Sequence, residues 1–133
     1  MSNWGEIVNG ELGKPFKWGG RGSDAYDCWG LVIRVYELLG RHVPRSLTWT
    51  SSSTEAITES HLEALAVSSW ERTESPGPGD VVSIGSRLPS HHVGVVTPFG
   101  ILHTVKKHGV VVTSEAALRS LGYQHIEYYK WVA

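Results

Sequence analysis

One cysteine and seven histidines supply the side chains of this 133-residue sequence that could carry nucleophilic chemistry. Cys28 follows a glycine-rich loop and opens a run with the apolar spacing of a helix. The amino end of a helix carries a partial positive charge and unpaired N–H groups, so it favours a thiolate and can bind an oxyanion. A lone cysteine can equally be a small buried hydrophobic residue, so its position alone leaves both interpretations open.

A thiol is mostly protonated at neutral pH, so a cysteine nucleophile needs a base. His91 and His92 immediately precede a Val-Gly-Val-Val run that is typical of a strand, where adjacent side chains point to opposite faces. His92 would share its face with Gly94, which we expect to leave open space for a substrate cleft. His103 lies in the next expected strand, close enough to orient the His92 ring. We therefore expect Cys28 as nucleophile, His92 as base and His103 as orienting residue.

The elements that would position these residues fall into a helical half and a strand half. Asn3 and Glu6 form a capping-box pattern for a short helix ending at Gly13, with Trp4, Ile7, Val8 and Leu12 turned inward. A second helix is expected over 29–39, with Leu31, Val32, Val35, Tyr36, Leu38 and Leu39 on its apolar side, and a third near 55–67.

Strand patterns begin only after a linker at 74–79. We expect strands at 80–84, 92–97, 101–105, 110–113 and 123–132, and a short helix that starts at Ser114. Helices first and an antiparallel sheet second predict an α+β fold, and 133 residues can form one domain over 1–133.

Composition excludes several classes of function. The net charge is −1 and the largest basic cluster is the Lys106–Lys107 pair, which argues against nucleic-acid binding. No apolar run is long enough to span a bilayer, so we expect no membrane insertion. The first residues lack the pattern of a secretory signal, and we expect synthesis in the cytoplasm without one.

Several stretches together resemble the NlpC/P60 family of cysteine peptidases. GKPFKWGG at 13–20 and YDCWGLV at 26–32 together resemble the family's nucleophile region. PGDVV at 78–82 resembles the family's entry strand, HVGVV at 92–96 its base strand, and ILH at 101–103 the strand with its third polar residue.

This resemblance implies a papain-like fold and a thiol protease with a Cys28–His92–His103 triad. The implied substrate is the stem peptide of peptidoglycan, commonly cut between D-glutamate and diaminopimelate. Trp29, where Ser is more usual, and the closing IEYYKW at 126–131 are similar to phage-tail members. That subtype implies that other tail proteins are partners. It also implies that the protein is located in the virion tail and acts in the periplasm or cell wall.

Four residues near the nucleophile are candidates for substrate binding: Tyr26, Asp27, Trp29 and Trp18. The two tryptophans flank the expected cleft and could stack on substrate, although core packing also accounts for them. Family members often carry Tyr where this chain has Phe16, and the role of that hydroxyl could pass to Tyr26 or to a backbone N–H.

Other functions fit parts of the pattern. The chain could be an interbacterial amidase effector, encoded beside an immunity protein, or an inactive structural domain of a phage tail. A zinc site built from His91, His92, His103 and His108 would lack the His-Glu-x-x-His spacing, and adjacent strand histidines diverge. We expect no metal and no cofactor.

Overall fold

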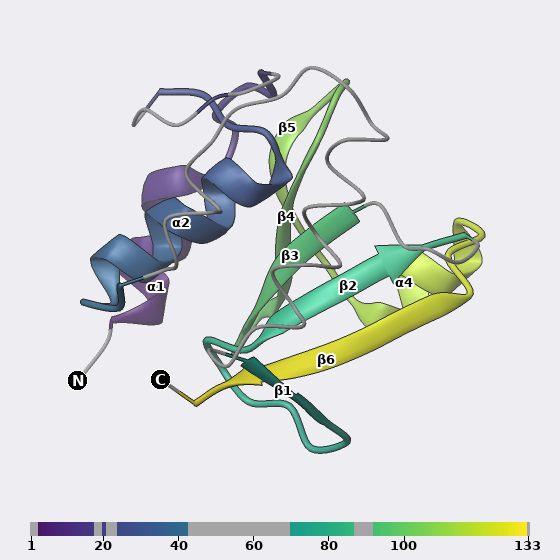
Figure 1. Ribbon diagram of the computed structural model, residues 1–133. Coiled ribbons are helices and arrows are strands. Elements are labelled where there is room, and N and C mark those ends of the chain that lie inside the picture. The colour runs from purple at the N-terminus through teal and green to yellow at the C-terminus, as the bar shows by residue number, and fades with distance from the viewer. Residues whose placement is uncertain (1–2, 18–19, 21–23, 43–69, 87–91, 133) are drawn as a thin grey trace.

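The computed structural model describes residues 3–17, 20, 24–42, 70–86 and 92–132 (Figure 1). The helix expected near 55–67, together with Trp18 and His91, lies outside these residues. The described helices are α1 (Trp4–Glu11), α2 (Cys28–Leu38) and α4 (Glu115–Ser120). The described strands are β1 (Trp70–Thr73), β2 (Val81–Gly85), β3 (His92–Thr97), β4 (Gly100–Val105), β5 (Gly109–Thr113) and β6 (His125–Trp131).

The strands form one antiparallel sheet in the order β1-β6-β2-β3-β4-β5. The expected α+β arrangement is therefore confirmed. The linker at 74–79 was expected to precede every strand, and this was wrong because β1 lies before it. β1 has four residues and is held by β6, with Trp70 opposite Trp131.

The two faces of the sheet are covered by different helices. α1 and α2 lie on one side of the part formed by β3, β4 and β5, and α4 lies on the other (Figure 1). The core beneath α2 includes Val93, Val95 and Leu102, whereas the smaller core beneath α4 includes Ile101 and Leu118. In β3, Val93 and Val95 thus face α2. His92, the first residue of the strand, belongs to the alternate set of side chains.

Local hydrogen bonds fix the ends of the helices. Asn3 caps α1 by accepting from the Glu6 N–H at 3.1 Å, as the capping-box pattern predicts. Ser114 caps α4 in the same way. The last strand starts at His125 instead of residue 123, because the Tyr123 N–H closes α4 on the Leu118 carbonyl.

Two leucines expected inside are half exposed, and a glutamate is buried instead. Leu12 and Leu38 are each 44% exposed, because Leu12 lies beyond the last turn of α1 and Leu38 ends α2. Glu11 is 2% exposed and faces α2, where it accepts from Arg34. None of the described helices has the length and apolarity needed to cross a membrane.

Candidate active site

Two histidines meet across neighbouring strands. His92 on β3 and His103 on β4 are joined by a hydrogen bond of 2.9 Å between His92 Nε2 and His103 Nδ1. Their rings lie edge to face, with centroids 5.1 Å apart and planes at 70°. The predicted base and orienting residue are therefore brought together, with the contact that a relay between two imidazoles requires.

The glycine beside His92 explains how the two strands come so close. A side-chain carbon at Gly94 would lie 2.8 Å from the Leu102 carbonyl oxygen and 3.1 Å from His103 Cβ. The expectation of open cleft space at Gly94 is therefore wrong, because β4 occupies it. The glycine instead permits a close backbone approach that sets His103 beside His92.

The regular pairing of β3 with β4 ends before it reaches His92. β3 and β4 are paired from Val95 opposite Leu102 to Thr97 opposite Gly100, whereas β3 stays paired with β2 as far as His92. The ring contact of the two histidines therefore spans the place where β4 has left the β3 ladder.

Burial determines the protonation state of His103. This residue is 3% exposed, and burial lowers the pKa of its imidazole from 6.5 to about 4. His103 is consequently neutral at pH 7 and carries a single N–H, on one ring nitrogen or the other. Its second nitrogen, Nε2, lies 2.8 Å from Thr113 Oγ1 on β5.

Sequence reasoning missed Thr113. The short turn between β4 and β5 could have predicted its position, because a turn that pairs Val105 with Gly109 also pairs Ile101 with Thr113. That register sets Thr113 on the same face as Ile101 and His103, because alternate residues of a strand share a face.

Cys28 is the first residue of α2 and is 5% exposed. Asp27 caps this helix: its side chain accepts from the Gly30 N–H at 2.8 Å. The first intrahelical bond runs from the Leu31 N–H to the Asp27 carbonyl, so the N–H groups of the first turn precede the helical ladder. α2 packs against β3 and β4, the strands that carry the two histidines, through Val93, Val95 and Leu102, which alternate with those histidines along the strands.

The loop before Cys28 is held from inside the protein. Tyr26 is fully buried, and its hydroxyl donates to Glu11 at 2.8 Å. Glu11 also forms ion pairs with Lys14 at 2.7 Å and with Arg34 at 3.3 Å. Burial and the neighbouring carboxylate raise the pKa of Tyr26, which keeps its hydroxyl a donor.

These contacts assign roles to the candidate substrate-binding residues. The Tyr26 side chain is fully buried, and its hydroxyl donates to the carboxylate of Glu11. The Asp27 carboxylate is occupied as a helix cap, with the residue 1% exposed. Trp29 is 3% exposed and packs on Trp70 with ring centroids 6.1 Å apart, so core packing is the role that the structure describes.

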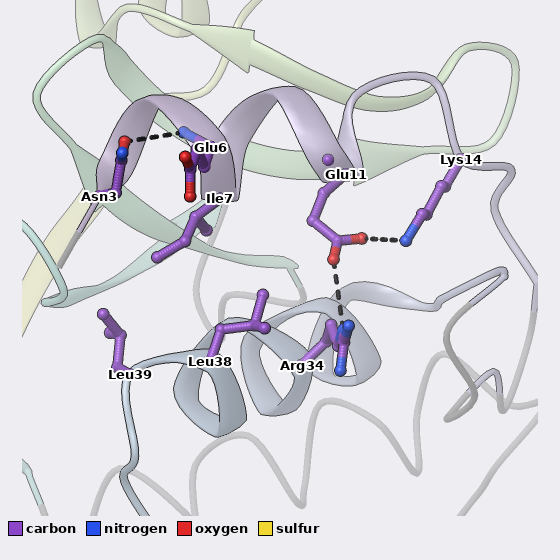
Figure 2. A pocket seen from close by; sticks show the side chains of 9 residues that line it. Asn3, Glu6, Ile7, Glu11, Lys14, Arg34, Leu38 and Leu39 are labelled. Carbon is purple, nitrogen blue, oxygen red and sulfur yellow. Dashed lines mark hydrogen bonds and ion pairs between the residues drawn. The ribbon is translucent and has the colours of Figure 1, made fainter.

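A separate hollow of about 650 Å³ lies between α1 and α2 (Figure 2). On the α2 side it is lined by Arg34, Leu38 and the C-cap residue Leu39, and its lining includes neither Cys28 nor a histidine. Figure 2 shows Glu11 between Lys14 and Arg34, and this buried carboxylate forms an ion pair with each of the two basic groups. Within the described ranges, no three His, Cys, Asp or Glu side chains are grouped so that they could hold a metal ion.

Solved structures confirm the fold. The NlpC/P60 domain of the peptidoglycan hydrolase SagA is similar with a TM-score of 0.61 and 20% identity, over 98% of this chain and 99% of that one. An NlpC/P60 family protein from Bacillus cereus ATCC 10987 gives a TM-score of 0.63 and 16% identity, over 98% of this chain and 41% of that one.

Curated proteins show the same likeness in sequence. "Probable endopeptidase p60" of Listeria welshimeri is 29% identical over 99 residues, which are 74% of this chain and 16% of that protein. A "Probable endopeptidase" of Corynebacterium glutamicum is 27% identical over 96 residues, 71% of this chain and 38% of its own length. The chain therefore spans only a minor part of these relatives.

The sequence profile of the NlpC/P60 family matches residues 13–126. This range includes the helix start at Cys28, both paired histidines and the strands that carry them. The chain belongs to the NlpC/P60 family.

Proposed function

We propose that this protein is a cysteine endopeptidase that hydrolyses the stem peptides of bacterial peptidoglycan. The observation that carries the proposal is the 2.9 Å contact between His92 and a buried, neutral His103, on strands packed against the helix that Cys28 begins. The names of the relatives, endopeptidases and a peptidoglycan hydrolase, support the reaction class.

The ring contact assigns the nitrogens of the base. His103 contacts Nε2 of His92, so Nδ1 is the nitrogen that would take the proton of the Cys28 thiol. The thiolate would then attack the carbonyl carbon of the scissile amide, and Nδ1–H would protonate the leaving amine. Water would hydrolyse the resulting thioester, with His92 again taking a proton, and regenerate the thiol.

Two features would stabilise charge during this reaction. The N–H groups at the start of α2 would receive the oxyanion of the tetrahedral intermediate, helped by the partial positive charge of the helix terminus. The neutral His103 would accept a hydrogen bond from imidazolium His92 without contributing a competing positive charge.

The substrate and context follow from the family resemblance. We propose cleavage between D-glutamate and diaminopimelate, and association with a phage tail. The residues that suggest the tail subtype share one cluster: Trp29 and Trp131 both pack on Trp70, at centroid distances of 6.1 and 5.1 Å. Finding the protein in purified tail particles would support this context. A neighbouring gene that encodes a tightly binding inhibitor would instead support the alternative of an interbacterial amidase effector.

Digestion of purified peptidoglycan tests the activity. The parent protein should release fragments that carry a new amino group on diaminopimelate, identified by mass spectrometry. Cys28→Ala should keep the fold and lose several orders of magnitude in turnover, as loss of a triad nucleophile does. Hydrolysis by the variant at near the parent rate would refute the mechanism.

A further inference from the structure

The hydrogen-bonded chain beyond the two histidines ends on a hydroxyl. His103 Nε2 lies 2.8 Å from Thr113 Oγ1, and Nδ1 of the same ring lies 2.9 Å from His92 Nε2. Thr113 is the last residue of β5, which is the terminal strand of the sheet. Three side chains from three consecutive strands are thus connected in series.

The proton on His103 decides whether His92 can be a base. If His103 carries its proton on Nδ1, it donates to His92 Nε2, and neutral His92 must carry its own proton on Nδ1. His92 then has no lone pair on Nδ1 for the thiol proton. If His103 carries its proton on Nε2, its Nδ1 accepts from His92 Nε2–H, and Nδ1 of His92 holds the lone pair.

Thr113 is placed to choose between these arrangements. We propose that the Thr113 hydroxyl is a positioning group that accepts a hydrogen bond from His103 Nε2–H. It thereby holds His103 in the tautomer that makes His92 a base on Nδ1. This inference deepens the proposed function, on which its catalytic consequence rests, while the tautomer itself can be observed without any substrate.

The geometry favours this role over simple strand packing. His103 is 3% exposed, so a ring N–H that lost its acceptor would find little water to replace it. Burial also keeps the ring neutral, with the pKa near 4, so His103 cannot satisfy both neighbours by carrying two protons. The hydroxyl on β5 is the group that meets Nε2 among the described contacts.

A matched pair of substitutions separates the hydroxyl from the shape of the side chain. Thr113→Val removes the hydroxyl and keeps the branched shape, whereas Thr113→Ser keeps the hydroxyl. Thr104→Val is the control, since Thr104 neighbours His103 on β4 but points to the opposite face. It is buried, and its Oγ1 has no hydrogen-bond partner among the residues that the structure describes.

Two readouts test the proposal: turnover on peptidoglycan, and the tautomer of His103 by ¹⁵N NMR of the ring. We expect the parent ring to be protonated on Nε2. Thr113→Val should lose about 10- to 100-fold in turnover, because it leaves the buried ring N–H of His103 without its acceptor in the productive tautomer. Thr113→Ser and Thr104→Val should stay near the parent. Thermal melting of each variant checks that the fold is kept.

Specific results would overturn the proposal. A parent His103 protonated on Nδ1 would refute it, as would parent-like turnover in Thr113→Val or equal losses in the Val and Ser variants. If the parent protein hydrolyses no peptidoglycan, the proposed function fails, and the NMR result alone decides the inference. It then stands if the Nε2–H tautomer is present in the parent and is lost in Thr113→Val.

Discussion

A methyl group added at Gly94 should damage the site and the fold together. The new carbon would lie 2.8 Å from the Leu102 carbonyl oxygen and 2.9 Å from Ile101 Cγ2, with His103 Cβ at 3.1 Å. The nearest atom belongs to the backbone, so β4 itself must move by several tenths of an ångström. Overpacking of this kind costs about 1–3 kcal/mol, and it would also pull His103 away from His92.

Gly10→Ala is the matched control for Gly94→Ala. Gly10 lies within α1, and a carbon added there meets nothing within 4 Å. Alanine should stabilise this helix by about 0.5–1 kcal/mol, because glycine loses more backbone entropy on folding. The same substitution should therefore shift stability in opposite directions at the two positions.

Chemical denaturation of the parent and both variants would measure these changes, with turnover recorded in parallel. We expect Gly94→Ala to unfold at lower denaturant and to lose activity, while Gly10→Ala unfolds at higher denaturant with activity unchanged. A Gly94→Ala protein as stable and as active as the parent would refute the close approach of β4.

Three further predictions follow from the same contacts. Thr104→Val should raise the free energy of unfolding by about 1 kcal/mol in denaturant titrations, because it removes a buried hydroxyl that lacks a partner in the described part of the chain; lower stability would contradict this. Burial lowers the pKa of His103 from 6.5 to about 4, so the neutral ring of the folded protein stabilises it fully above pH 6.5. The free energy of unfolding should therefore fall by about 3 kcal/mol as the pH is lowered from 6.5 toward 4. His103→Asn should remove that pH dependence of stability, and an unchanged pH profile would show that His103 is not its source. His92→Ala should abolish hydrolysis of peptidoglycan while His91→Ala costs little, and the reverse would place the strand register off by one residue.

The helices were predictable because their signals are local. Asn3 and Glu6 marked the start of α1, and the apolar spacing marked α2 within one residue of its observed start. The strand boundaries of β3 matched the prediction, because a β-branched run between His92 and a Pro-Gly turn leaves little freedom. The pairing of His92 with His103 also followed from the short connection between their strands.

What escaped prediction depends on contacts between distant segments. β1 is too short to give a recognisable strand pattern in the sequence. It forms because it pairs with β6, more than fifty residues away in sequence. The burial of Glu11 requires Arg34 and Tyr26 to surround it. Gly94 was interpreted as open space because the sequence does not reveal how closely β4 approaches.

The most direct test of the central claim is the reaction of Cys28 with iodoacetamide near pH 7. The chain has a single cysteine, so the extent of alkylation reports on Cys28 alone. A nucleophile at a helix start, paired with a histidine base, should have a thiol pKa below that of a free cysteine and react rapidly. We predict that hydrolysis of peptidoglycan falls in proportion to the alkylated fraction and is unaffected by EDTA. Full hydrolysis after complete alkylation, loss of hydrolysis on chelation, or a thiol that resists alkylation in the folded protein would contradict the account.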